Sequence, residues 1–246
     1  MENIIDEESL KSALSALRNI ERAKENYSFV SRVYSITGFM KAYNNGHHGI
    51  DTEGLILPPV IDTMLFESIA ADKGALKRIV FLGNDMKRKR VEDFVSIAEK
   101  NPDLDFVIVG NGGSYLSEIL ENKEFKNISY LGILAHEELL KELARCDLHI
   151  LTSRSEGFPK GIIECAAAGI PSIVYDDYGA AEWIENWENG VVCKTQNDIQ
   201  QAIERIKSTP DLLSTLSKGA IELSNRYDVE KVVKLYETVI EDLYAS

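Results

Sequence analysis

Two glutamates, Glu156 and Glu164, bracket a glycine-containing segment in the second half of the chain. The segment lies between two apolar runs, 148–152 and 172–175, an order that predicts a strand, a loop, a helix and a second strand. Backbone N–H groups are free at a helix start and the helix dipole is positive there, so a phosphate can bind. Glu156 precedes this start, and we expect Glu164 about two turns inside the helix. The arrangement suits a nucleotide sugar, which has a central diphosphate and hydroxyl-rich groups at both ends.

The same segment resembles the E-x7-E motif of retaining GT-B glycosyltransferases, in particular the large group 1 (GT4-like) family. Cys165 and Ala167 replace an alanine and a methionine of the family pattern, and both replacements are tolerable in size. The bland alternative is a surface helix with two solvated glutamates, and the flanking glycines and strands argue against it. The positions that meet the pattern are Ser153, Glu156, Gly157, Phe158, Glu164, Ala166, Ala168, Gly169 and Pro171.

A basic cluster at 87–90 stands out in a chain whose net charge is −13. It lies in the loop after a predicted strand, where the family carries G-R-L-x-x-x-K and holds the donor diphosphate with the arginine and the lysine. Gly83 and Lys89 match this pattern, whereas Asn84 stands at the arginine position. The resemblance therefore implies that Arg88 or Lys87 supplies the missing cation from a neighbouring position.

A second glycine-rich turn, Gly110 to Gly113, follows another predicted strand. A dinucleotide fingerprint needs a further glycine where Tyr115 stands and an acidic residue about 20 positions later, so a nucleotide-binding oxidoreductase is disfavoured. In the family, a G-x-G at this strand end lies close to the nucleotide, which implicates Gly110 and Gly112. The segment 131–134 resembles the family's F-x-G element, after which backbone groups contact the base, and this implicates Ile133.

The resemblance also implies a role for each candidate residue. Glu156 and Lys89 would be catalytic: Glu156 orients the donor sugar through its hydroxyls, and Lys89 neutralises the leaving diphosphate. Glu164 would bind the ribose hydroxyls. The remaining contacts to the donor would come from the backbone of Phe158, Pro159, Lys160 and Gly161.

The resemblance implies a UDP- or GDP-sugar as substrate, no separate cofactor and retention of anomeric configuration. The D-x-D sequence Asp103-Leu104-Asp105 precedes its predicted strand rather than following it, so we expect no metal site there. Three cysteines, Cys146, Cys165 and Cys193, have no metal-like spacing and are interpreted as buried free thiols.

From residue 78 onward, apolar runs alternate with helical stripes. This rhythm predicts an α/β fold: a Rossmann-like parallel sheet with helices on both faces, as in the GT-B C-terminal domain. Ligands of such sheets bind at the carboxyl ends of the strands. Strands are predicted at 78–82, 106–109, 128–131, 148–151, 172–175 and 191–193. Helices are predicted at 91–100, 115–122, 136–146, the motif itself, 180–186, 198–207, 210–224 and 229–244.

We interpret residues 1–58 as a small, incomplete α/β remnant of the N-terminal acceptor domain. It would contain a helix at 7–26, a strand at 33–36, a helix at 38–43, a turn-rich loop at 44–49 and a strand at 55–62. Residues 59–228 form the predicted nucleotide-sugar-binding domain, and 229–246 a C-terminal crossover helix. The chain is then a fragment, a subunit completed by a second chain that supplies the acceptor domain, or a naturally reduced protein.

The acidic composition disfavours nucleic acid and bare anionic membrane as principal partners. No apolar stretch is long enough to span a bilayer, and the first residues lack a secretory signal. We therefore expect a cytoplasmic protein, attached to a membrane only through a partner.

The leading hypothesis is a retaining hexosyltransferase of GT-B type, or its donor-binding part. It would transfer sugar to a glycan, lipid or protein acceptor in cell-surface glycan or glycoconjugate synthesis. The alternative is a non-catalytic nucleotide-sugar-binding or regulatory subunit of a split glycosyltransferase. The Glu156 and Glu164 pair favours the first hypothesis, and Asn84 with the short front segment favours the second.

Overall fold

A computed structural model of the chain describes residues 18–26, 29–71, 73–121 and 125–245. The chain divides into two compact units, Met1–Leu57 and Pro58–Ser246. Of the helix expected at 7–26, positions 7–17 lie outside the described residues, and positions 18–26 are helical. Assignment of the first unit to an acceptor domain stays a prediction.

The first unit contains the short helix α2 (Gly38–Tyr43), which begins where expected because the Thr37 hydroxyl accepts a hydrogen bond from the Met40 N–H at 3.0 Å. The turn-rich loop predicted after α2 is instead one π-helical turn, Asn44–His48. The predicted strands at 33–36 and 55–62 were wrong: only single bridges form, between Ser35 and Ile56 and between Ile61 and Asp228. Prolines at 58 and 59 offer no N–H donor, which prevents a longer ladder.

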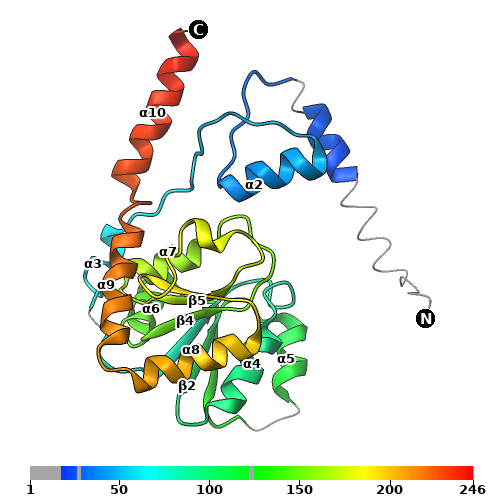
Figure 1. Ribbon diagram of the computed structural model, residues 1–246. Coiled ribbons are helices and arrows are strands. Elements are labelled where there is room, and N and C mark those ends of the chain that lie inside the picture. The colour runs from blue at the N-terminus through cyan, green and yellow to red at the C-terminus, as the bar shows by residue number, and fades with distance from the viewer. Residues whose placement is uncertain (1–17, 27–28, 72, 122–124, 246) are drawn as a thin grey trace, which may run out of the picture. The chain divides into compact units, whose positions relative to one another are not determined.

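The second unit is built on a six-stranded parallel sheet with the order β3-β2-β1-β4-β5-β6 (Figure 1). The parallel register of every pair confirms the predicted α/β fold. The strands are β1 (Arg78–Leu82), β2 (Asp105–Val109), β3 (Ile128–Gly132), β4 (Leu148–Leu151), β5 (Ser172–Tyr175) and β6 (Gly190–Cys193).

Helices flank the sheet on both faces (Figure 1). The helices of the second unit are α3 (Met64–Glu67), α4 (Val91–Lys100), α5 (Gly113–Glu121), α6 (His136–Leu143), α7 (Lys160–Ala167), α8 (Gln196–Ser208), α9 (Leu212–Ser224) and α10 (Val229–Ala245). Among the described residues, none of these helices is long and apolar enough to cross a bilayer.

The helix predicted at 180–186 was wrong and is a single 3₁₀ turn, Ala180–Glu182. The backbone leaves the helical path because Trp183 and Ile184 are buried and Asn186 forms a bridge with Gly190. The Asn186 side chain then accepts a hydrogen bond from the Val192 N–H at 3.0 Å, which ties the segment to β6.

Successive side chains along a strand point to opposite faces of the sheet, and both faces are buried. Ile79 and Phe81 of β1 join the main core cluster with Phe94 of α4 and Phe106 of β2, while Val80 points to the opposite face. The rings of Phe81 and Phe106 each lie 5.3 Å from that of Phe94. Burial on both faces explains why β1, β2, β4 and β5 are continuous apolar runs in the sequence, whereas the edge strand β3 is largely exposed.

The strand order reverses beside β1. The chain passes from β1 to β2 and β3 on one side, and then returns to place β4 on the other side. The loops after β1 and β4 consequently diverge, and they leave a crevice at the carboxyl ends of these strands.

Candidate active site

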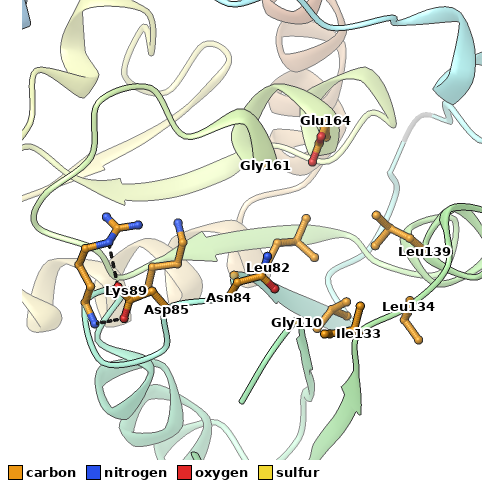
Figure 2. A pocket seen from close by; sticks show the side chains of 13 residues that line it. Leu82, Asn84, Asp85, Lys89, Gly110, Ile133, Leu134, Leu139, Gly161 and Glu164 are labelled. Atoms are coloured by element: carbon orange, nitrogen blue, oxygen red, sulfur yellow. Dashed lines mark hydrogen bonds and ion pairs between the residues drawn. The ribbon is translucent and has the colours of Figure 1, made fainter. Parts of the chain in front are cut away.

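A cavity of about 470 Å³ opens at this crevice (Figure 2). Its wall is formed by the ends of β1 and β2, the loops after β1 and β3, and helices α6 and α7. Figure 2 shows Lys89 and Asp85 on one side, Ile133 and Leu139 on the other, and Glu164 projecting from α7. The cavity thus has a charged end and an apolar end.

Eight of the thirteen residues predicted from the sequence line this cavity: Gly83, Asn84, Arg88, Lys89, Gly110, Ile133, Gly161 and Glu164. The other five, Glu156, Gly112, Phe158, Pro159 and Lys160, are not part of its wall.

Two predicted glycines are required by close approach of the loops. The Lys89 side chain runs over Gly83, where a Cβ would overlap its methylenes. Gly110 has a φ of 129°, and a Cβ there would overlap the carbonyl of Gly83. The loops after β1 and β2 therefore touch through their backbones, which only glycine permits.

The loop that carries Lys89 is anchored to the end of β4. The Thr152 hydroxyl lies within hydrogen-bonding distance of the carbonyl oxygens of Lys89 and Arg90, at 2.9 and 2.8 Å. Arg90 adopts a left-handed conformation with a φ of 54° as the N-cap of α4. These contacts fix the direction in which the side chains of this loop leave the backbone.

The carboxylate of Glu156 lies at the centre of an ion-pair cluster. Lys89 Nζ is 2.7 Å from Glu156 Oε1, and Arg88 Nη1 is 3.2 Å from Glu156 Oε2. The side chains of Glu156 and Lys89 are only 8% and 14% exposed, so solvent screens this pair weakly. Glu156 therefore reaches the cavity through the two cations that it holds.

Glu164 has a different environment. The helix α7 begins at Lys160, so Glu164 lies about one turn inside it, and the expected position two turns inside was wrong. The chain stays extended through Pro159, the N-cap residue, which delays the start of the helix. Burial raises the pKa of the Glu164 carboxyl, while Lys160 and His136 oppose part of the shift.

The start of α7 presents its backbone to the cavity at Gly161. The Phe158 side chain points elsewhere and packs against Tyr227 and Trp183, with ring centroids 4.9 and 5.3 Å apart. Phe158 thus anchors the loop before α7, and only its backbone is left for a ligand.

Asn84 and Gly112 shape the wall by internal hydrogen bonds. The Asn84 side chain accepts a hydrogen bond from the Asn111 N–H at 3.0 Å. Gly112 donates its N–H to the Tyr130 hydroxyl at 2.8 Å, and that hydroxyl donates to the Gly110 carbonyl at 3.1 Å. Tyr130 was not singled out from the sequence.

Five further lining residues were missed: Leu82, Asp85, Val109, Leu134 and Leu139. Leu82 and Val109 end predicted strands, so the rule that ligands bind at strand ends could have indicated them. Leu139 lies one turn into α6 and depends on the orientation of that helix, which the sequence does not reveal.

Among the described residues, no group of histidine, cysteine, aspartate or glutamate side chains could hold a metal ion. Asp103 pairs with Lys207 at 2.7 Å and Asp105 begins β2, so both lie at the amino ends of the strands. The three cysteines are free and buried, as expected.

The sequence profile of the family "Glycosyl transferases group 1" matches residues 66–222. One relative is the N,N'-diacetylbacillosaminyl-diphospho-undecaprenol alpha-1,3-N-acetylgalactosaminyltransferase of Campylobacter jejuni, which is 28% identical over 190 residues, or 73% of this chain and 49% of the relative. Another is the alpha-monoglucosyldiacylglycerol synthase of Acholeplasma laidlawii, which is 31% identical over 159 residues, or 62% of this chain and 39% of the relative. The chain spans about half the length of the curated relatives it matches.

Solved structures share the fold at low sequence identity. Anabaena HepE, crystallised with UDP-glucose, is 18% identical with a TM-score of 0.72, and the match covers 89% of this chain and 65% of HepE. The sucrose-phosphate synthase of Thermosynechococcus elongatus is 19% identical with a TM-score of 0.76, and the match covers 87% of this chain and 58% of that one. These structures show the shared fold, and the profile match over residues 66–222 shows that the chain belongs to the group 1 glycosyl transferase family.

Proposed function

We propose that the chain is the donor-binding part of a retaining GT-B hexosyltransferase that takes its sugar from a UDP- or GDP-sugar. The observation that carries this proposal is the division of the cavity into a cationic end and an apolar end, with Glu164 projecting into it (Figure 2). A nucleotide diphosphate has the matching order of a base, a ribose and two phosphates.

The difference between the cationic end and the apolar end of the cavity orients the ligand. The diphosphate lies by Lys89 and Arg88, near the positive end of α7. Glu164 accepts hydrogen bonds from the ribose hydroxyls, and the base packs between the apolar side chains of Ile133 and Leu139. Gly161 lets the ligand approach the backbone of α7 closely.

Catalysis in this arrangement is stabilisation of the leaving group. Negative charge builds on the diphosphate as the glycosidic bond breaks, and Lys89 and Arg88, which line the cavity, neutralise it. Glu156 would contact hydroxyls of the transferred sugar, as the E-x7-E motif implies. Retention of anomeric configuration rests on the E-x7-E motif.

The names of related proteins support a glycan or lipid acceptor. The Campylobacter relative is named for a diphospho-undecaprenol acceptor, and the Acholeplasma relative is a glycolipid synthase. By analogy we place this chain on the cytoplasmic side, in cell-surface glycan or glycoconjugate synthesis. The acceptor half would come from a further domain or a second chain.

The decisive experiment is a thermal-shift titration with UDP- and GDP-sugars. We expect at least one of them to raise the melting temperature and Glu164→Ala to abolish the shift. Glu241→Ala, an exposed position on α10, is the matched control and should keep the shift. If no nucleotide sugar stabilises the wild-type chain, the donor site is disproved.

A second measurement distinguishes an active transferase from a non-catalytic binding subunit. Release of free sugar, or its transfer to a lipid or glycan acceptor, is followed with the same donor and the purified chain. If the purified chain binds the donor without turnover, and addition of a partner chain restores turnover, the split enzyme is favoured.

A further inference from the structure

Glu156 is the only acidic group among the described residues that contacts both Lys89 and Arg88. Both cations line the cavity, whereas Glu156 does not. Its carboxylate is therefore paired with the same two cations that a diphosphate in the cavity would use.

The two cations are held unequally. Arg88 has two anchors besides Glu156: its Nη1 donates to the Ser155 carbonyl at 2.5 Å, and its Nε lies 3.4 Å from Asp85 Oδ2. Asp85 Oδ1 also accepts a hydrogen bond from the Arg88 N–H at 3.1 Å. For the side chain of Lys89, the one hydrogen bond in the described part of the chain runs from Nζ to Glu156.

We propose that Glu156 is the internal counterion of Lys89 and Arg88, that the donor's diphosphate replaces it at these cations, and that Asp85 keeps Arg88 in place during the exchange. The inference rests on the proposed function, because it concerns the same cavity and the same donor. It adds a competition between a protein carboxylate and the ligand, and a positioning residue for that competition.

Charge favours the exchange. A diphosphate brings more negative charge than one carboxylate, and it lies in the cavity where Gly161 and the start of α7 add positive potential. Lys89 has a flexible stem with rotatable donors, so its ammonium group can turn from Glu156 to a phosphate oxygen. Glu156 then loses its main partner and becomes available to donor sugar hydroxyls.

Arg88 needs a fixed position for this to work. Its guanidinium is 44% exposed and would lose one anchor when Glu156 is displaced. Asp85 and the Ser155 carbonyl remain, and the planar guanidinium can bind both while a further N–H faces the phosphate. Asp85 acts through Arg88, which explains a carboxylate in the wall of an anion-binding cavity.

The test compares three substitutions that each remove one negative charge: Glu156→Gln, Asp85→Asn and the remote control Glu241→Gln. UDP and GDP are titrated calorimetrically into the 246-residue chain, and uridine and guanosine serve as ligands without phosphate. Asp85 and Glu156 both lie close to the cations of the cavity, so simple electrostatics predicts that removal of either charge tightens diphosphate binding and that removal of the remote charge has little effect.

The exchange predicts opposite signs instead. Glu156→Gln should bind the nucleoside diphosphate about tenfold more tightly, because a competing carboxylate is gone. Asp85→Asn should bind it about threefold more weakly, because Arg88 loses its orientation. Neither should alter nucleoside binding, and Glu241→Gln should match the wild type. Glu156→Asp, too short to hold both cations, should give an intermediate tightening and covers the case that Glu156→Gln does not fold.

The outcomes are distinguishable. If wild-type chain binds a nucleoside diphosphate but the Glu156 variants bind it equally or more weakly, the counterion exchange is overturned and the proposed function stands. If Asp85→Asn binds the nucleoside diphosphate as tightly as the wild type or more tightly, the positioning role of Asp85 is overturned. If neither UDP nor GDP binds the wild type, both the proposed donor site and the counterion exchange are disproved.

Discussion

Glu156 and Glu164 belong to one short motif, yet the structure gives them opposite electrostatic environments. Glu156 is surrounded by cations from a loop 67 residues earlier in the chain, with ion-pair distances of 2.7 and 3.2 Å. Glu164 is half-buried on α7, and loss of water raises the pKa of its carboxyl. The motif therefore supplies two acids of different kinds.

The difference teaches how one segment can serve two ends of a ligand. A paired carboxylate is released only when something else satisfies its cations, so Glu156 is coupled to the phosphates. Glu164 is desolvated and has no ion-pair partner among the described residues, so under the proposed function its carboxylate is ready to accept hydrogen bonds from the ribose hydroxyls. The following predictions test this contrast, beginning with the largest effect.

Lys89→Ala should strongly reduce the reaction of the donor, because Lys89 pairs with Glu156 at the charged end of the cavity. We expect sugar transfer or donor hydrolysis to fall about 100-fold in kcat, because a preorganised positive charge at the leaving diphosphate is lost. Radiolabelled donor turnover measures this. Lys207→Ala, which removes the lysine paired with Asp103 at the opposite edge of the sheet, is the control. Comparable rates for Lys89→Ala and the wild type would contradict the role of this cation.

Glu164→Ala should instead weaken ground-state binding at the other end. Loss of a charged acceptor for two ribose hydroxyls should weaken UDP and uridine by the same factor, about 30-fold. Calorimetric titration of both ligands checks the equality. A loss confined to UDP would mean that Glu164 serves the phosphates, and the contrast with Glu156 would disappear.

Much of the fold was predictable because burial on both faces leaves a simple signal in the strands other than the exposed edge strand β3. All six strands of the second unit appear as apolar runs, and the glycines at 83 and 110 mark where two loops touch. Position in a parallel sheet then brings the strand ends together, which is why eight of thirteen candidate residues share one cavity.

The rest depended on contacts between distant segments. The ion pairs of Glu156 join residues 67 and 68 positions apart, and no local pattern encodes their geometry. The side chain of Phe158 turned away from the cavity because Trp183 and Tyr227 offer an aromatic site. The short turn at 180–182 likewise follows from the tie of Asn186 to β6 rather than from local helix propensity.

A third prediction concerns stability and pH at Glu164. The pKa of this carboxyl is raised in the folded state by burial, so the folded chain favours the protonated form more than the unfolded chain does. Its stabilising contribution is complete below the unfolded pKa and is lost as pH rises through the folded pKa.

Glu164→Gln should therefore raise the melting temperature at pH 7 by about 2 °C, with the gain vanishing toward pH 4. Melting curves across this range test the sign. Glu156→Gln is the comparison, and it should lower the melting temperature because two partly buried cations lose their counterion. Equal signs for the two variants would break the contrast between the acids.

The smallest effect is expected at Asn84, whose side chain joins the loops after β1 and β2. It lies in the loop that carries Lys89, and it accepts the Asn111 N–H from the loop after β2. Asn84→Ala removes this tie and should weaken UDP and uridine alike, by about threefold, since the wall shared by both ends loosens. Asn84→Asp keeps an acceptor for the Asn111 N–H but adds a negative charge beside the phosphates. It should therefore spare uridine while weakening UDP more than the alanine variant does, as measured by paired calorimetric titrations. If Asn84→Asp weakened uridine as much as UDP, the side chain would contact the nucleoside directly, and the loop tie would not explain its position.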